Sequence, residues 1–501
     1  MAPVGRPTSG ADSRERADTD RRRTIVLTTA VCVAVVGAGA LAQHSPLGAA
    51  AVLAGVGLLL VGSVVALSRR DATAVLTLLI VLLFLLPEPY VLVGPLRSVG
   101  YPALLVGIGA LTLWAAGRVL GTVAARPLHP ARWTVLAYLA AAVLALGASF
   151  MRALSPLEES GANRSLFPVL AAVGIALIAV DGITSRERLD VLLQRLVLVG
   201  GAAAFIGMLE FFDHGFSYRT LMRLPGLTTN VDLTDATRSG FTRVDGAAAH
   251  PIEYAVAISV LIPLALHYVL HGGSRAVRRR SAVALVLMLG VVPMTVSRSG
   301  LLAIAVGVGV YAVAMTGRQR ANAAILGILG LAAFRALVPG LLGTLRSLVF
   351  IGSQDPSIAH RTDDYAKVPA LLEGHLVIGR GLGTFQPLQY FFLDNQYIGS
   401  LLEGGLIGLA ALIALFVVGM GLARGARKRA HDVPTRSLGQ ALAASVAALA
   451  AASGTFDQMA FRQTGFLVFL LLGCAGALWS MTVSDQSVAG DLAPAPPQKA
   501  R

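Results

Sequence analysis

Two arginines lie beside apolar segments, where a permanent positive charge is costly. Arg298 lies in the segment PMTVSRSG between two apolar runs, and Arg243 lies seven residues before His250. Charged residues at membrane depth are rare and usually face a polar cavity or a charged partner. Because a guanidinium group is permanently charged and binds two oxygens at once, both arginines predict contact with an anion such as a diphosphate. For Arg298 the alternative is a side chain that reaches from a helix end to the lipid headgroups.

His250 stands directly before Pro251, at the start of another apolar run. Proline suits the first turn of a helix, so His250 is expected at or near the N-cap of a helix that begins at Pro251. The start of a helix offers free N–H groups and a positive dipole, which favour an anion. This position makes His250 a candidate for contact with phosphate, and capping with packing alone is the alternative.

A glycine-rich segment, GRGLGTF at residues 379–385, precedes the next apolar run. It does not lie between a strand and a helix, so it does not indicate a dinucleotide-binding fold. The glycines instead predict tight turns beside a ligand or the close approach of a helix. Arg380 within this segment is a candidate for contact with substrate. Arg361, earlier in the same loop, belongs either to a channel for an acceptor or to a solvated surface.

Three polar residues follow where the chain enters the membrane again. Asp394 and Asn395 fall at the start of the run from Gln396, where simple N-capping is the alternative to a functional role. Glu403 lies about two turns further inside the run. An unpaired carboxylate is costly there, so Glu403 is expected to have a partner. Asn395 and Glu403 are both candidates for contact with substrate.

The elements that position these residues are predicted to be membrane-spanning helices. Of the 501 residues, 55% are hydrophobic and 14% are charged, which excludes a cytosolic globular enzyme. The apolar runs are long and continuous, unlike the short alternating strands of an outer-membrane barrel. The fold class is therefore an all-α polytopic membrane protein with about 14 transmembrane helices. Their expected starts are near Thr24, Pro46, Ala72, Pro102, Trp133, Leu166, Val191, Pro251, Ser281, Ser299, Ala321, Gln396, Leu438 and Thr464.

Positive charge marks every second loop between these spans. Positively charged residues near a span resist translocation, so these loops are expected to be cytoplasmic. This orientation places both termini in the cytoplasm and the protein in the inner or plasma membrane. It also accounts for the net charge of +14 without nucleic acid as a partner.

The predicted organisation has three parts. Residues 1–23 and 483–501 are expected to be disordered cytoplasmic ends, because they are polar and poor in aromatic residues. Residues 24–482 form the transmembrane domain, with long extracytoplasmic loops at about 212–250 and 340–395. Loops of this length are usually functional or disordered, and these two contain the candidate residues.

In this context the second half of the chain resembles the O-antigen ligase and O-antigen polymerase family of membrane glycosyltransferases. Members typically have a histidine followed by asparagine, nine residues, a glycine, two residues and another glycine. Asn395, Gly405 and Gly408 fit that spacing, and Asp394 occupies the histidine position. The other matching segments are Arg243 with Gly246 and His250-Pro251, the sequence SRSG at 297–300, and the glycines at 379–383.

The resemblance implies a GT-C-like enzyme that acts outside the cytoplasm. It would transfer an oligosaccharide from a polyprenyl diphosphate to a sugar hydroxyl, as in the synthesis of an exopolysaccharide, capsule or O-antigen. Arg243 and Arg298 would bind the diphosphate and stabilise the charge that develops on it. The resemblance implies no metal or cofactor. The expected partners are the lipid-linked glycan, its acceptor and membrane lipids, and a chain-length regulator or flippase is a further candidate.

Asp394 departs from the family pattern at the position where ligases carry a histidine thought to activate the acceptor. A carboxylate accepts a proton, but its ordinary pKa near 4 makes it a weak base unless burial raises that value. The substitution favours a polymerase or another branch over a ligase. It also leaves the base open between Asp394, His250, His360 and His375. The main rival function is a transporter or flippase of a lipid-linked or anionic solute.

Overall fold

The computed structural model describes residues 72–94, 97–120, 129–213, 216–222, 224–229, 237–238, 241–338 and 364–491. The predicted spans near Thr24 and Pro46 lie outside these residues, and so do the N-terminal segment 1–23 and Arg361.

Within the described residues, eight helical segments are long and apolar enough to cross a membrane. They are α4 (Pro102–Val119), α5 (Pro130–Ser149), α6 (Pro156–Gly182), α7 (Arg186–Phe212), the pair α9 (Pro251–Ser259) and α10 (Ile262–His271), α13 (Gly317–Leu337), α17 (Gln396–Arg429) and α19 (Arg462–Asp491). The bundle also contains α3 (Ala72–Leu85), α11 (Arg275–Met294), α12 (Arg298–Ala312) and α18 (Val433–Ala452). The chain is thus an all-α polytopic membrane protein, as predicted.

The predicted spans from Ala72 onward coincide with these helices, with three differences. First, the span expected near Leu166 begins at Pro156, because Ser155 and Glu158 form a capping box there. Second, the span expected from Pro251 consists of α9 and α10, since Pro263 cannot continue the hydrogen-bonding of a straight helix. Third, α19 continues to Asp491, past the predicted start of the C-terminal tail at residue 483.

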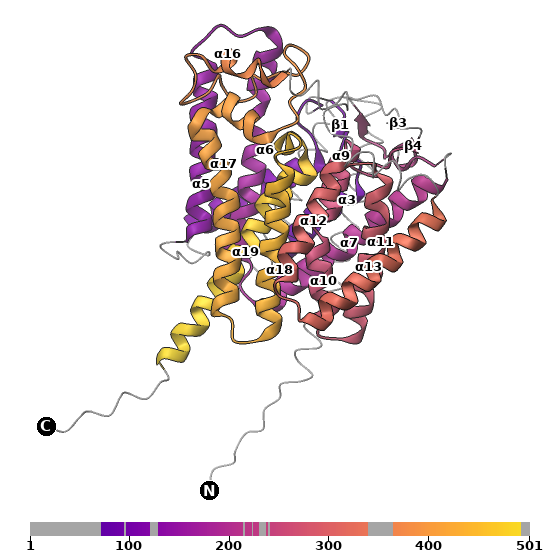
Figure 1. The fold of residues 1–501 in the computed structure, drawn as a ribbon. Coiled ribbons are helices and arrows are strands. Elements are labelled where there is room, and N and C mark those ends of the chain that lie inside the picture. Colours follow the sequence, from indigo (N-terminus) through magenta and orange to yellow (C-terminus); the bar gives the residue numbers. More distant parts are fainter. Residues whose placement is uncertain are drawn as a thin grey trace, which may run out of the picture.

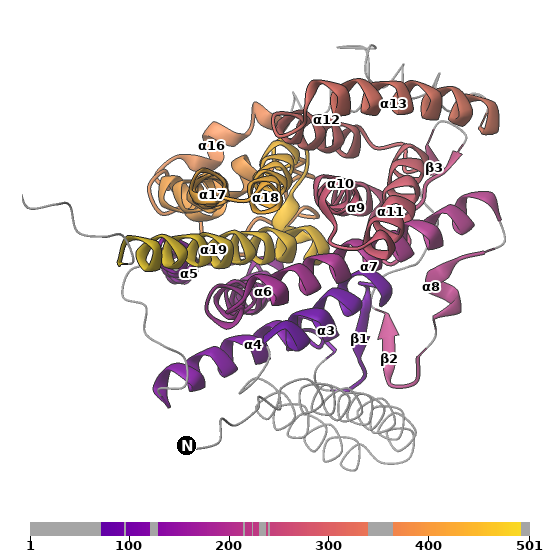
Figure 2. The same cartoon turned by 90° about the horizontal axis from the view of Figure 1, so that it is seen from below.

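The centre of the bundle is formed by α9, α10, α18 and α19. Figure 2, a view along the bundle, shows these helices enclosed by their neighbours and α13 at the edge. The apolar windows of Pro251–His271 and of α19 are each 83% buried, whereas α13 has no buried residue. An exposed helix with such an apolar window suits contact with lipid.

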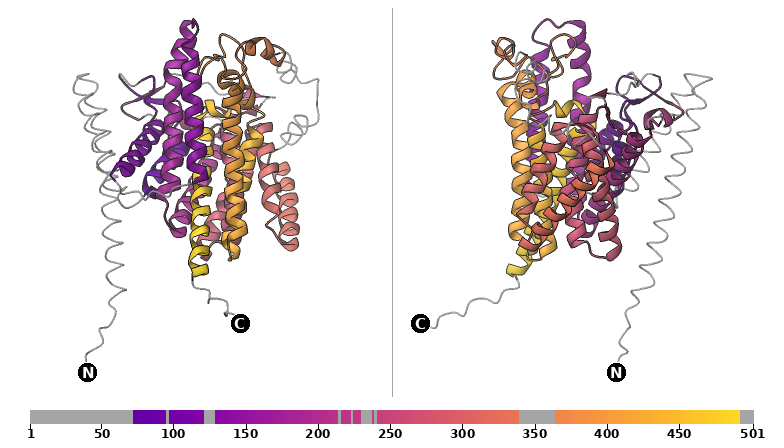
Figure 3. Two further views of the ribbon diagram at one scale, coloured as in Figure 1. Left: turned by 90° about the vertical axis from the view of Figure 1, so that its left-hand side faces the viewer. Right: turned by 45° about the vertical axis from the view of Figure 1, so that its right-hand side comes forward.

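Short strands and a short helix gather at one end of the bundle. β1 (Tyr90–Leu92) pairs antiparallel with β2 (Leu227–Thr229), and β3 (Thr237–Arg238) pairs with β4 (Phe241–Thr242). These strands and α16 (Val368–Leu372) lie at the upper end in Figure 1, which we call the loop end. The upper parts of α5 and α6 project beyond their neighbours at this end (Figure 3).

The opposite end carries tight, arginine-rich turns. The α10–α11 and α17–α18 turns both lie at the lower end in Figure 1. They are adjacent to Arg275 and Arg278–Arg280 in the first case, and to Arg424 and Arg427–Arg429 in the second. The described parts of the two predicted long loops and the arginine-rich turns are therefore at opposite ends of the helices.

Candidate active site

Arg243 contacts the turn that leads into Arg298. Its Nε donates a hydrogen bond to the backbone oxygen of Thr295 at 2.9 Å. Arg298 is the first residue of α12, and Ser297 caps that helix by accepting the N–H of Gly300 at 3.4 Å. The side chain of Arg243 therefore binds the turn that leads directly into Arg298, at the start of α12.

Val296, between Thr295 and the cap, has an unusual backbone conformation with a φ of +50°. This left-handed region is unfavourable for a β-branched residue, and such strain clusters at functional sites. Val296 is fully buried, so packing holds the strained turn in place. The turn that aims Arg298 is thus fixed by its surroundings.

The segment 243–250 is held by contacts at both of its ends. Asp245 forms an ion pair with Arg219 at 2.5 Å, and the Arg219 side chain is only 8% exposed. Further along, the N–H of Ala249 donates to the carboxylate of the fully buried Glu253 at 2.9 Å. Buried charged contacts of this kind are strongly destabilising to break, because removing one partner leaves the other uncompensated. They fix the path by which the chain at the loop end returns to the bundle.

His250 is the N-cap of α9, as predicted from the following proline. Its Nδ1 accepts a hydrogen bond from the N–H of Ile252 at 3.1 Å. Burial and the positive charge of Arg243 lower the pKa of His250 to about 4, while the charge of Asp394 acts in the opposite direction. His250 is therefore neutral at pH 7.

Asn395 is the N-cap of α17. Its Oδ1 accepts hydrogen bonds from the N–H groups of Tyr397 at 3.0 Å and Ile398 at 3.3 Å. Capping thus explains why an asparagine is suited to this position. Its contact with substrate stays a prediction.

The turn between α18 and α19 joins the starts of α12 and α17. The N–H of Gln396 donates to the backbone oxygens of Ser453 at 2.8 Å and Phe456 at 3.1 Å. In the same turn, the hydroxyl of Thr455 donates to Ser299 Oγ at 2.8 Å. Asp394 is therefore brought to the side of the bundle on which Arg298 lies.

Asp457, in this same turn, is a residue that the sequence reasoning missed. Burial raises the pKa of Asp457 from 3.8 to about 7, and the charge of Asp394 acts in the same direction. The available signal was topological, because Asp457 lies in a short outer turn between the spans predicted near Leu438 and Thr464. The charge of Asp394 thus acts on Asp457, whose turn contacts the starts of α12 and α17.

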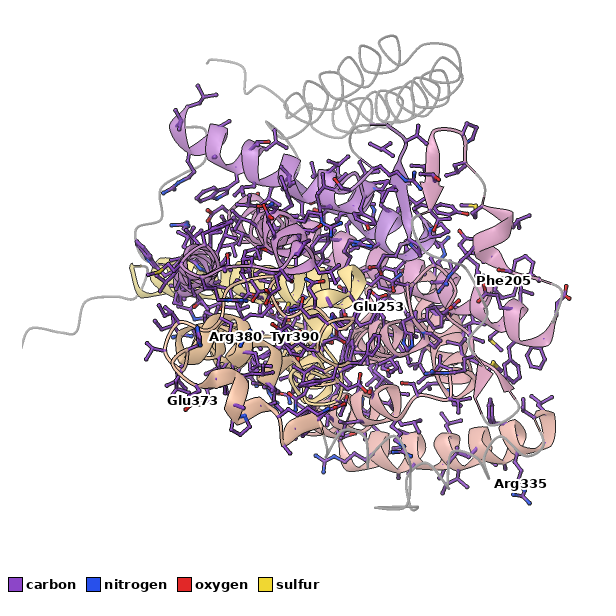
Figure 4. All side chains as sticks on the ribbon, turned by 90° about the horizontal axis from the view of Figure 1, so that it is seen from above. Phe205, Glu253, Arg335, Glu373, Arg380 and Tyr390 are labelled. Carbon is purple, nitrogen blue, oxygen red and sulfur yellow. The ribbon has the colours of Figure 1, made fainter. Side chains whose placement is uncertain are left out.

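Arg380 lies in a second polar cluster, at the top of α5 and α6. Its NH2 group is 2.8 Å from the hydroxyl of Tyr390 and 3.8 Å from the carboxylate of Glu158. Tyr390 donates to that carboxylate at 2.7 Å, and Arg152 pairs with it at 2.6 Å. Viewed onto the loop end, Arg380 and Tyr390 lie together near α17, whereas Glu253 is nearer the centre (Figure 4). The structure separates Arg380 from the arginine pair, and its role in substrate contact stays a prediction.

Glu403 has the partner that its position required. Its carboxylate accepts the backbone N–H groups of Phe385 at 3.2 Å and of Gly383. The glycine-rich segment therefore lies directly against α17. Contact of Glu403 with substrate stays a prediction, but its observed bonds are to the protein.

Glycine is required where this segment crosses its neighbours. Gly381 has a φ of +117°, and a Cβ there would lie 2.4 Å from the Cα of Ser149. Gly405, inside α17, has a φ of +61° and approaches the carbonyl oxygen of Val377 so closely that a Cβ would lie 2.3 Å away. The predicted close approach to a helix is confirmed. These glycines shape the segment that leads to Asp394.

Besides Asp394, the sequence left three histidines as candidates for the general base, and the structure places them differently. His360 lies outside the described residues, as Arg361 does. The Nδ1 of His375 is 2.8 Å from the backbone oxygen of Glu373, within the outer loop. His250, as described above, uses Nδ1 to cap α9.

Taken together, the fold and the site define a multi-pass helical membrane protein with a basic and acidic cluster at its loop end. Residues 283–413 match the family model described as O-antigen ligase. The resemblance inferred from the motifs is confirmed for this part of the chain, which runs from within α11 to within α17. No curated protein matches the chain.

The matched residues include Arg298, Arg380, Asp394, Asn395 and Glu403. The match supports glycan ligation of the O-antigen ligase type, by a glycosyltransferase-like enzyme acting on a lipid-linked glycan and an acceptor. Arg243, His250 and Asp457 lie outside the matched range, and they join the site only through the fold.

Proposed function

We propose that this protein transfers a glycan from a polyprenyl diphosphate to a sugar hydroxyl at its loop end, on the extracytoplasmic face. The observation that carries this proposal is the contact between Arg243 and the turn before Arg298. It brings the guanidinium group of Arg243 to the turn before Arg298, the first residue of α12, where the helix dipole also favours negative charge. A leaving diphosphate gains negative charge, and positive charge at this position would stabilise it.

The two arginines bind the diphosphate and stabilise the charge that grows on it. During transfer, the acceptor oxygen forms a bond to the anomeric carbon, and the bond from that carbon to the diphosphate oxygen breaks. The electron pair of the broken bond stays with the diphosphate. Preorganised cations aimed at such developing charge supply a large part of the catalysis in many enzymes.

The proton of the acceptor hydroxyl passes to a carboxylate, with Asp394 as the first candidate. Asp457 strengthens this proposal, because its charge and that of Asp394 influence each other. Burial raises the pKa of Asp457 to about 7, and the charge of Asp394 acts in the same direction, so Asp457 holds a proton at a higher pH than an exposed aspartate does.

The arrangement of the arginine-rich turns supports the proposed orientation. They lie at the end opposite the site, and positively charged loops are retained in the cytoplasm. This orientation puts both termini in the cytoplasm and the site outside the inner or plasma membrane. A lipid-linked glycan of an exopolysaccharide, capsule or O-antigen is presented there, and a chain-length regulator or flippase remains a proposed partner.

A transporter is a weaker proposal on the present geometry. Substrate sites of transporters lie near mid-membrane, at the interface of two repeats. Here the residues of the candidate site come from helix starts and turns at one end. This location favours an enzyme that receives its substrate at the membrane surface.

The test is transfer by purified protein in lipid vesicles that contain a polyprenyl-diphosphate-linked oligosaccharide. We expect longer glycans to appear, as measured by gel electrophoresis of the released saccharides. Movement of the intact lipid-linked donor between leaflets without any new glycosidic bond would support the transporter instead. The variant Arg298→Ala should form no product, whereas Arg335→Ala, on the exposed surface of α13, serves as the matched control.

A further inference from the structure

We infer that His250 works as a neutral hydrogen-bond donor to a diphosphate oxygen, through its Nε2–H, and does not serve as the general base. The inference rests on the proposed transfer reaction and assigns one residue of that site its role. It also removes one of the open candidates for the base.

The cap of α9 determines which ring nitrogen carries the proton. The N–H of Ile252 lies 3.1 Å from Nδ1 of His250, and a backbone N–H group only donates. Nδ1 must therefore provide a lone pair. In a neutral imidazole the proton is then on Nε2, which becomes a donor with no lone pair for accepting another proton.

The same bond opposes protonation of the ring. A doubly protonated imidazole has a donor on both nitrogens, so Nδ1 would face another N–H group and the cap would be lost. Arg243 and Arg219 add positive charge nearby, and burial disfavours a charged ring. All three effects keep the ring neutral at the pH at which an envelope enzyme works.

The His250 ring is partly exposed, and a neighbouring aromatic ring restricts its orientation. His250 is half-buried, and the centroid of its ring is 6.1 Å from that of Phe461, at the start of α19. The charges of Arg243, Asp394 and Arg219 all act on the ring. The Nε2–H group is thus the donor that His250 can offer to an anion bound by Arg243 in the proposed mechanism.

A neutral donor has an advantage over a third cation in this position. It stabilises an anionic oxygen without repelling the two guanidinium groups when the diphosphate is absent. A base at this position would instead have to give up the cap each time it took a proton. The proton of the acceptor therefore goes to the aspartates, and Nε2–H serves the leaving group.

Two variants separate the donor from the cap. His250→Asn keeps an excellent N-cap, because its Oδ1 replaces Nδ1, but it has no donor at the position of Nε2. His250→Gln places an amide N–H near the position of Nε2 but loses the cap. We expect His250→Asn to fold with an unchanged Tm and to lose about 10- to 100-fold in kcat/KM, as for a lost hydrogen bond to a charged group.

We expect the opposite pattern for His250→Gln, with a lower Tm and kcat/KM within about fivefold of the natural protein. Ser274→Ala, which removes the cap of α11 at the opposite end, is the matched control for loss of a cap alone. A purely structural role for His250 predicts an active His250→Asn and an impaired His250→Gln, and that result would overturn the inference.

A spectroscopic test is independent of the transfer assay. Nitrogen NMR of ¹⁵N-histidine-labelled protein in lipid discs should show His250 protonated at Nε2 and unprotonated at Nδ1 at pH 7. Inorganic pyrophosphate should shift the Nε2 signal in the natural protein and much less in Arg298→Ala. A proton on Nδ1, or an Nε2 signal that pyrophosphate leaves unmoved, would refute the donor role. Failure of transfer by the natural protein, with these signals as expected, would instead refute the proposed function.

Discussion

Arg243 reaches across 52 positions of the sequence to the backbone oxygen of Thr295, three residues before Arg298. The donor is Nε, so the contact anchors one side of the guanidinium group to the protein. A guanidinium group has five N–H donors in a planar fork, and the remaining ones are oriented by this anchor. The contact therefore both joins the two arginines and sets the direction in which one of them points.

The first prediction concerns pH and Asp457. A proton acceptor must be ionised, and the pKa of Asp457 is raised to about 7. If Asp457 takes part in accepting the proton, kcat/KM should rise about tenfold per pH unit below pH 7 and level off above it. Asp457→Asn should lower the plateau and remove the rise near pH 7. A profile of the variant with the same slope and midpoint would exclude Asp457.

The same pKa shift makes a prediction about stability. The folded protein binds this proton more tightly than the unfolded chain, whose aspartates titrate near 3.8. Ionisation of Asp457 therefore costs stability increasingly as the pH rises from about 4 to about 7. Asp457→Asn should have a higher Tm than the natural protein at pH 8, and the difference should shrink towards pH 5. Thermal unfolding in detergent at the two pH values measures this, and a lower Tm at pH 8 would contradict it.

The sequence predicted the helices well, for physical reasons. Lipid requires long apolar helices, so their positions are visible in hydropathy alone, and only capping or proline moved their boundaries. Arg243 and Arg298 were found because charge beside apolar runs is conspicuous. That both reach one turn depends on a side chain bonding to a distant backbone oxygen, and no sequence pattern reports such a bond.

The sequence was less informative about carboxylates. Glu403 was expected to have a partner, and its partners are the backbone N–H groups of Phe385 and Gly383. Because almost every residue has a backbone N–H group, no residue type in the sequence could identify these two. Asp457 looked like an ordinary turn residue, and only the bonds of Gln396 to Ser453 and Phe456 bring its turn to the start of α17. The partners of Glu403 and the location of Asp457 both depend on contacts between distant parts of the chain, which only the structure shows.

Glu403 provides a prediction about the outer loop. Glu403→Ala removes the acceptor for two backbone N–H groups and should destabilise the protein by about 1–3 kcal/mol for each donor left buried. Glu403→Gln retains one acceptor oxygen and should be milder. The measurement is Tm together with proteolysis of the loop around residues 379–393. Glu373→Ala, on the exposed side of the same loop, is the control, and equal behaviour of the three variants would refute the bracing role.

Removal of metal ions should leave transfer unchanged. In the proposed mechanism two guanidinium groups supply the positive charge that a metal ion often supplies to a leaving diphosphate. Extraction with EDTA, followed by assay in metal-free buffer, should reduce the rate by less than twofold. A large loss that magnesium or manganese restores would show that the arginines are not sufficient.

The arginine pair itself is tested by parallel substitutions. Arg298→Ala and Arg243→Ala should each lower kcat about 10²- to 10³-fold, the cost of removing one group that stabilises developing charge. Arg298→Lys and Arg243→Lys should recover only part of this, since an ammonium group keeps the charge but cannot bind two oxygens in a fork. Arg335→Ala should retain full activity, because this side chain lies on the exposed surface of α13.

The most direct measurement is the turnover of Arg298→Ala in vesicles, with its amount and thermal stability matched to those of the natural protein. The account predicts a folded, inserted variant that forms almost no new glycosidic bonds from a polyprenyl-diphosphate-linked donor. Product of normal length and amount from this variant would contradict the central claim that the two arginines hold the leaving diphosphate.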